Sequence, residues 1–232
     1  MPGLDHLRLR PQQMDRQRFR HERILPFRRP VTGAITDLRF MLQDDQRSAT
    51  WRKREMTTSS HIGRSIETAR NYLAEHPEGA LHTDSAASAV VEDGLRCRVE
   101  GPGGATIYTD MPAGVGGEST APSPGWFTRA GHASCEATLI TMRAAELGIA
   151  LQRVEVVVDS ESDARGILAM DDEVPAGPLS SRTRVRITAD GVDPQALHDL
   201  VEWADRYSPI SDATRRAVPM SVEVESAVRE LS

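Results

Sequence analysis

The sequence predicts an α+β fold, in which hairpin-connected strands alternate with separate helices. Two turn sequences, Glu92-Asp-Gly94 and Gly101-Pro-Gly-Gly104, separate three short apolar runs, as expected for antiparallel hairpins. A later run, Gly125–Leu147, lacks proline, is rich in alanine and places apolar residues three and four positions apart, which predicts a long helix. Because hairpin turns rather than crossover helices join the first strands, the class is α+β and not α/β.

Each further element follows from its own apolar spacing. Besides the long helix, the predicted helices are Ser59–His76, Pro194–Tyr207 and Asp212–Ala217. The predicted strands are Ala86–Val91, Leu95–Val99, Ala105–Thr109, Val154–Val158, Thr183–Ile187 and Ser221–Val224. The first helix ends where Pro77 follows His76, and Gly148 ends the long helix.

The first 55 residues differ from the rest in composition. Arginines crowd this segment without helical apolar spacing, so it cannot bury enough surface to offset its ordering entropy. We expect residues 1–55 to be a disordered basic tail or a mis-assigned start, with Met56 as an ordinary start. A basic arm that touches an anionic partner is the competing interpretation. Residues 56–82 then form an N-terminal helical segment, and residues 83–226 form the main domain.

Composition excludes several classes of function. The chain of 232 residues has a formal net charge of −6, and the part after residue 55 is net acidic, which argues against nucleic acid as a partner. No apolar run is long enough for a membrane helix, and Met1–Arg20 is too polar for a secretory signal. Two cysteines do not make a secreted disulfide framework, so we expect a cytoplasmic protein with free thiols.

Two motifs carry a family resemblance. The first is Ala121-Pro-Ser-Pro124 followed on the long helix by Cys135, and the second is Ser208-Pro-Ile-Ser-Asp-Ala-Thr-Arg-Arg-Ala-Val-Pro219. Together they resemble the two active-site segments of the OsmC/Ohr family, the osmotically induced and organic-hydroperoxide-resistance proteins. The resemblance covers about residues 83–226. It implies two three-stranded antiparallel sheets around long central helices, built as an intertwined homodimer.

The resemblance also implies roles for individual residues. Cys135 stands where the family has its peroxide-reactive cysteine, and Ser208 stands where the family has its resolving cysteine. A serine cannot form a disulfide, so three alternatives follow: the resolving thiol is external, such as a low-molecular-weight or dihydrolipoyl-type reductant, or it is Cys97, or there is no redox cycle. The glutamate that holds the family's catalytic arginine is replaced by Gly125. Glu118 is a candidate substitute by nearness in sequence, although its spacing does not require this role.

Other residues are candidates for stabilising a thiolate at Cys135. His132 lies three residues before Cys135 on the same helical face, where it either forms a thiolate–imidazolium pair or points to solvent or a dimer partner. Arg96 and Arg98 flank Cys97 on a strand and are either the cation for the thiol or solvated surface charges. Trp126, Phe127 and Met142 are candidates for an apolar pocket and equally for core.

The sequence therefore leads to two hypotheses of different class. One is thiol-dependent reduction of organic hydroperoxides by Cys135, in response to oxidative stress. The other is a catalytically degenerate protein that binds a small apolar ligand or senses redox state through one cysteine. Neither hypothesis includes a cofactor, and no histidine, cysteine or carboxylate spacing predicts a metal site.

Overall fold

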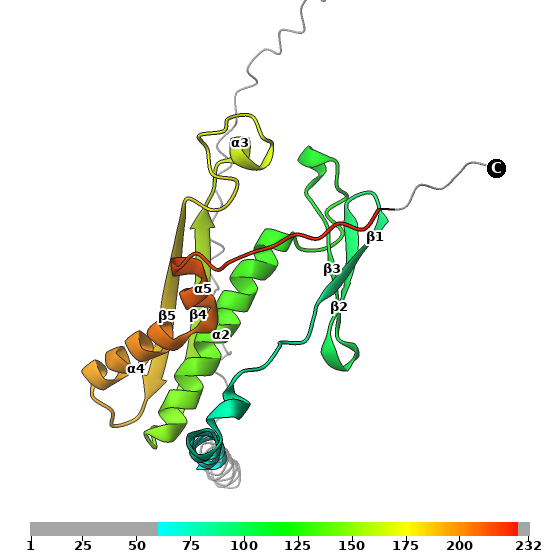
Figure 1. Ribbon diagram of the computed structural model, residues 1–232. Coiled ribbons are helices and arrows are strands. Elements are labelled where there is room, and N and C mark those ends of the chain that lie inside the picture. The colour runs from blue at the N-terminus through cyan, green and yellow to red at the C-terminus, as the bar shows by residue number, and fades with distance from the viewer. Residues whose placement is uncertain (1–59, 227–232) are drawn as a thin grey trace, which may run out of the picture. The chain divides into compact units, whose positions relative to one another are not determined.

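The computed structural model describes residues 60–226 of the chain (Figure 1). A helix over residues 60–75 is followed by a three-stranded sheet, a long helix and a two-stranded sheet with its own helices. This order confirms the predicted α+β class. The expectation for residues 1–55 lies outside the described part of the chain.

The first sheet is an antiparallel meander in the order β1-β2-β3. Its strands are β1 (Ser88–Asp93), β2 (Arg96–Glu100) and β3 (Thr106–Thr109). Gly94 turns β1 into β2 with a φ of 51°, a left-handed conformation that favours glycine. The register places Cys97 of β2 between Val91 of β1 and Thr109 of β3. Both predicted hairpins are therefore confirmed.

Helix α2 (Pro124–Glu146) is the long helix that the sequence predicts. The Ser123 side chain caps its start by accepting a hydrogen bond from the backbone N–H of Trp126, and Pro124 occupies the first turn. Gly148 follows its end with a φ of 68°. The buried residues of α2 include Ile140 and Ala144, which lie four positions apart on one face.

The second sheet pairs β4 (Leu151–Glu161) with β5 (Ser180–Ala189), both longer than predicted. Between them lies the short helix α3 (Ala164–Ile167). The third strand expected at Ser221–Val224 is not formed, because residues 217–226 have no regular secondary structure. Val222 and Val224 are exposed, so their alternating pattern does not bury one face of this segment among the described residues.

The core lies where α2 crosses α4 (Pro194–Tyr207) beside the second sheet. Ile140 and Ala144 of α2 meet Leu200 and Ala204 of α4, and sheet residues pack around them. Helix α5 (Pro209–Arg215) follows α4 after a single residue, Ser208. Figure 1 shows α2, α4 and α5 beside the β4–β5 hairpin. No helix of residues 60–226 is long and apolar enough to cross a membrane.

Candidate functional site

Cys135 and Ser208 are in contact. The Ser208 hydroxyl donates a hydrogen bond to the Sγ of Cys135 at 3.3 Å, although 73 residues separate them in the chain. Ser208 also caps α5, because its Oγ accepts the backbone N–H of Ser211 at 3.3 Å. Its side chain is fully buried, and Cys135 is partly buried on α2. The fold thus brings together the two positions that the sequence motifs single out.

The next residue of α2, Glu136, belongs to a polar network that reaches Ser208 through Ser211. Its carboxylate is only 1% exposed and accepts a hydrogen bond from the Ser211 hydroxyl, with 2.6 Å between the oxygens. The Nε2 of His132 lies 2.9 Å from the same hydroxyl oxygen. Since the single hydroxyl proton is directed at Glu136, the imidazole N–H donates to Ser211. This chain of bonds satisfies a carboxylate that is costly to bury alone.

His132 therefore does not form the predicted pair with Cys135. Its hydrogen bond runs to Ser211, and its Nε2 lies 3.6 Å from the Oε1 of Glu136. Among residues 60–226 no hydrogen bond joins His132 to Cys135. The three-residue spacing places both on one side of α2, but α5 covers that side and supplies Ser211 as the nearer partner. The ring also does not point freely to solvent, since only 13% of the side chain is exposed.

The two candidate arginines are engaged by other groups. Arg96 donates to the Thr120 hydroxyl at 2.8 Å and stacks over the Tyr108 ring at 4.4 Å. Arg98 forms ion pairs with Glu92 and Glu100, and the hydrogen bond to Glu92 is the main cause of its raised pKa. Within residues 60–226, no hydrogen bond connects either guanidinium to Cys135.

A buried aspartate, which the sequence does not single out, fixes the loop before α2. The Asp110 carboxylate accepts the backbone N–H and the hydroxyl of Thr120, each at 2.8 Å. It also accepts the backbone N–H groups of Met111 and Glu118. The bonds from Thr120 are the main cause of the lowered pKa of Asp110. The loop is therefore anchored at one carboxylate.

The position that the family resemblance assigns to glutamate is open. A Cβ on Gly125 would lie 3.9 Å from the Nη1 of Arg129 and 4.0 Å from the Oγ of Ser123, which is ordinary contact. Arg129 instead donates to the Ser160 hydroxyl at 3.3 Å. Glu118 contacts Asp110 through its backbone, so this contact does not make its side chain the missing clamp.

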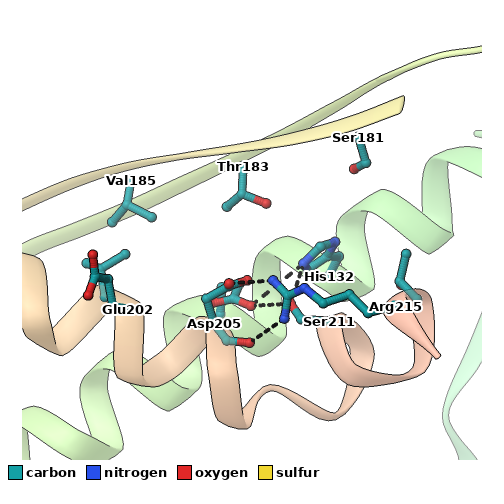
Figure 2. Close-up of a pocket in the computed structure, with 11 residues that line it drawn as sticks. His132, Ser181, Thr183, Val185, Glu202, Asp205, Ser211 and Arg215 are labelled. Carbon is teal, nitrogen blue, oxygen red and sulfur yellow. Dashed lines mark hydrogen bonds and ion pairs between the residues drawn. The ribbon is translucent and has the colours of Figure 1, made fainter. Parts of the chain in front are cut away.

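A cavity of about 510 Å³ lies beside the Glu136 network (Figure 2). Its lining includes His132, Glu136, Asp205 and Arg215, together with hydroxyl groups from β5 and α5. Arg215 pairs with the Asp205 carboxylate and donates to the Asp205 backbone oxygen at 3.1 Å. Cys135 does not line this cavity, and neither do the three residues expected to form an apolar pocket. The cavity combines polar and charged side chains with apolar surface, to which Val185 and Val201 contribute.

Both cysteines are free thiols. Cys97 is held in β2 by its pairing with Val91 and Thr109, and Cys135 has Ser208 as its hydrogen-bonding neighbour. The site thus combines one thiol, one buried hydroxyl donor and a neighbouring carboxylate network.

Part of the chain is similar to known proteins. Residues 116–223 match the family model described as OsmC-like protein. An OsmC-like protein from Mycoplasma pneumoniae has a TM-score of 0.51 at 12% identity, covering 59% of this chain and 91% of that chain. An organic hydroperoxide resistance protein OsmC from Legionella pneumophila has 26% identity and a TM-score of 0.44, with coverage of 59% and 91%. No curated protein matches the sequence.

Proposed function

We propose that the protein, whose residues 116–223 match the family model described as OsmC-like protein, reduces organic hydroperoxides with Cys135 as the attacking thiol. The electrons come from an external thiol. The proposal assigns the protein to the response to oxidative stress.

One observation carries the proposal, namely the hydrogen bond from Ser208 to the Sγ of Cys135. Ser208 stands where the OsmC/Ohr family has its resolving cysteine. Its contact with Cys135 therefore resembles that of a cysteine pair in which an oxygen replaces one sulfur. The thiolate is the nucleophilic form of a cysteine, and the Ser208 hydroxyl proton points at the sulfur that would attack the peroxide. The same hydroxyl cannot form a disulfide, so it assists the first half of a peroxidase cycle and not the second.

The reaction balances with one external dithiol or two monothiols. The Cys135 thiolate attacks the terminal oxygen of the hydroperoxide, the O–O bond breaks, and the alkoxide takes a proton and leaves as an alcohol. Sulfur gives up two electrons and becomes a sulfenic acid. The external thiol then displaces hydroxide, which leaves as water, and forms a mixed disulfide. A second thiol attacks that disulfide, releases oxidised reductant and returns Cys135.

Cys97 is the internal alternative to an external thiol. It is a free thiol in the middle strand of the first sheet, flanked by Val91 and Thr109. A strand position restricts its movement toward Cys135, which favours the external reductant. A small thiol or a dihydrolipoyl-type dithiol fits this role, and we propose a cytoplasmic location, where such thiols are kept reduced.

We also propose that the protein works as a homodimer. Apolar side chains of the first sheet are exposed, among them Val90, Val91 and Ile107. Met220 and Val222 of the C-terminal segment are exposed as well. Exposed apolar side chains on a small sheet are a feature of many protein interfaces. Light scattering at micromolar concentration should return twice the chain mass, and a monomer would contradict this part of the proposal.

The second candidate function is ligand binding without turnover, and the cavity beside Glu136 is the observation that favours it. Its lining mixes charged side chains with apolar surface, which fits a small ligand that carries both a polar group and an apolar part. In that case a ligand would raise the melting temperature without any loss of peroxide. Any redox sensing by such a binding protein would then take place at Cys135.

The test of the proposal is consumption of cumene hydroperoxide by the full chain. We expect turnover with dihydrolipoamide or another small thiol, loss of turnover in Cys135→Ser, and full turnover in the matched control Cys97→Ser. Turnover that disappears in Cys97→Ser would assign resolution to the internal thiol. Absence of peroxide loss with every thiol reductant, in folded protein, would overturn the proposal.

A further inference from the structure

Three side chains converge in the cavity beside Glu136. They are His132 and Glu136 from α2 and Asp205 from α4, and one ligand atom of each lies within 4.8 Å of the other two. Figure 2 shows His132, Asp205 and Arg215 converging on one region of the cavity. The pair on α2 has the spacing that puts two side chains on one helical face.

The charges in this cluster are unbalanced. Two carboxylates, one of them almost fully buried at Glu136, share a single guanidinium, that of Arg215. The hydrogen-bonding partner of the Glu136 carboxylate is the Ser211 hydroxyl, and the nearby imidazole donates to that same hydroxyl. A second cation is therefore favoured at this place, because buried carboxylates are stabilised by pairing or by metal coordination.

We propose that His132, Glu136 and Asp205 bind one divalent transition-metal ion of the Zn²⁺ type. An imidazole nitrogen with two carboxylate oxygens is a ligand set that such ions accept, and three protein ligands leave one position open toward the cavity. This site shares no ligand with the thiol chemistry of Cys135, so it stands or falls separately from the proposed function.

The geometry needs only small movements. Two ligand atoms at about 2.0–2.2 Å from a tetrahedral zinc ion lie about 3.3–3.6 Å apart. The present separations of up to 4.8 Å close when both side chains of a pair shift by less than about 1 Å. Ser211 already holds Glu136 in place through its hydroxyl, which is the role of an outer-shell partner in metal sites.

Arg215 gives the site a distinctive property. Its guanidinium pairs with the Asp205 carboxylate, which is also the third metal ligand. Metal binding therefore displaces Arg215 from Asp205, and the arginine and the metal compete for one group. Removing the guanidinium should strengthen metal binding, whereas removal of a surface charge elsewhere should not.

The test uses the full chain after treatment with a chelator, titrated with Zn²⁺ in competition with a metal indicator and with Co²⁺ by visible absorption. We expect one ion per chain. Glu136→Gln and Asp205→Asn should each lower affinity at least about tenfold, and Ser211→Ala should lower it about 10- to 100-fold. Arg215→Gln should raise it. The matched control is His198→Gln, because exposed His198 and Glu202 repeat the four-residue spacing on α4.

Several outcomes would overturn the site. These are the absence of binding, equal affinity in Glu136→Gln and the unsubstituted chain, or unchanged affinity in Arg215→Gln. A sulfur-to-cobalt charge-transfer band that disappears in Cys135→Ser would also overturn it, since the proposed ligands are nitrogen and oxygen. Melting curves check that each variant folds, and the gain expected for Arg215→Gln cannot arise from unfolding.

Discussion

The Oγ of Ser208 lies 3.3 Å from the Sγ of Cys135 and donates a hydrogen bond to it. The same oxygen caps α5 by accepting the N–H of Ser211. One buried hydroxyl thus ties the thiol on α2 to the start of a helix that follows it by more than 70 residues. The position that the family resemblance assigns to a second cysteine holds a hydrogen-bond donor instead, which is why a one-cysteine cycle is proposed above.

Ser208→Cys should convert the site into a two-cysteine pair. Because the two side-chain atoms are already 3.3 Å apart, a small adjustment brings sulfur atoms to the roughly 2.05 Å of a disulfide. We expect one equivalent of cumene hydroperoxide to produce an intramolecular disulfide, seen as the loss of two hydrogens in the intact mass.

Two matched variants control this experiment. In the background of Cys97→Ser the disulfide should still form, because Cys97 is not a partner. Ser208→Ala should form none and should be less stable by about 1 kcal/mol, since the α5 cap is lost. A Ser208→Cys chain that keeps its thiols reduced after peroxide treatment would show that the two positions are not poised to react.

Ionisation of Asp110 should make the free energy of unfolding decrease at low pH. Hydrogen bonds from Thr120, followed by those from Met111 and Glu118, lower the pKa of Asp110 in the folded chain. The unfolded chain has an ordinary pKa near 4, so the stabilisation is complete above about pH 4 and is lost as pH falls through the lower folded pKa. Urea denaturation of Asp110→Asn should show lower stability at pH 7 and a smaller decrease in acid.

The control for this prediction is the exposed Asp190, whose replacement by asparagine should leave the acid dependence of stability unchanged. If Asp110→Asn and the unsubstituted chain lose stability in parallel between pH 7 and pH 3, the carboxylate at position 110 is not the anchor described above.

Gly117→Ala should damage the loop that leads to α2. A Cβ at this position would lie 1.9 Å from the backbone oxygen of Met111 and 2.9 Å from the Oδ1 of Asp110, so backbone has to move. We expect a loss of more than about 1 kcal/mol in the free energy of unfolding. Gly114→Ala is the matched control, because its Cβ would meet nothing within 4 Å. Equal stability of the two variants would contradict the close approach.

Gly125→Glu should stabilise α2. The position has room for a side chain, and it lies in the first turn of the helix. Replacing glycine by alanine there should add about 0.5–1 kcal/mol, and a glutamate should add about 0.3–1 kcal/mol more through the helix dipole. Thermal melts of Gly125→Ala and Gly125→Glu separate these contributions. A glutamate variant less stable than the alanine variant would mean that the carboxylate clashes or stays unpaired.

Local patterns predict the elements well, because they depend on neighbours in sequence. The bounds of α2 and the two hairpins of the first sheet follow from apolar spacing and from Gly94 and similar turn residues. The early start of α5 was missed, although Ser208 followed by Pro209 is a typical capping sequence. The prediction of a strand at Ser221–Val224 was wrong. Alternating apolar residues show that a segment is compatible with a sheet, but they do not show that it pairs with another strand.

The site was predicted only in part, because its contacts join distant segments. The resemblance singles out Cys135 and Ser208, and the fold brings them together. The partners of His132 could not be found this way, since Ser211 lies 79 residues further along the chain. The four-residue spacing of His132 and Glu136 was a signal for a shared helical face. Nothing in the sequence shows that Asp205 and Arg215 meet that face.

The central claim is that Cys135 attacks hydroperoxides without an internal partner. The most direct test is the intact mass of the chain after a brief stoichiometric dose of cumene hydroperoxide in the presence of dimedone, which traps sulfenic acids. The account predicts one dimedone adduct per chain that disappears in Cys135→Ser and persists in Cys97→Ser. A folded chain that keeps a free thiol at Cys135 and carries no adduct would contradict it.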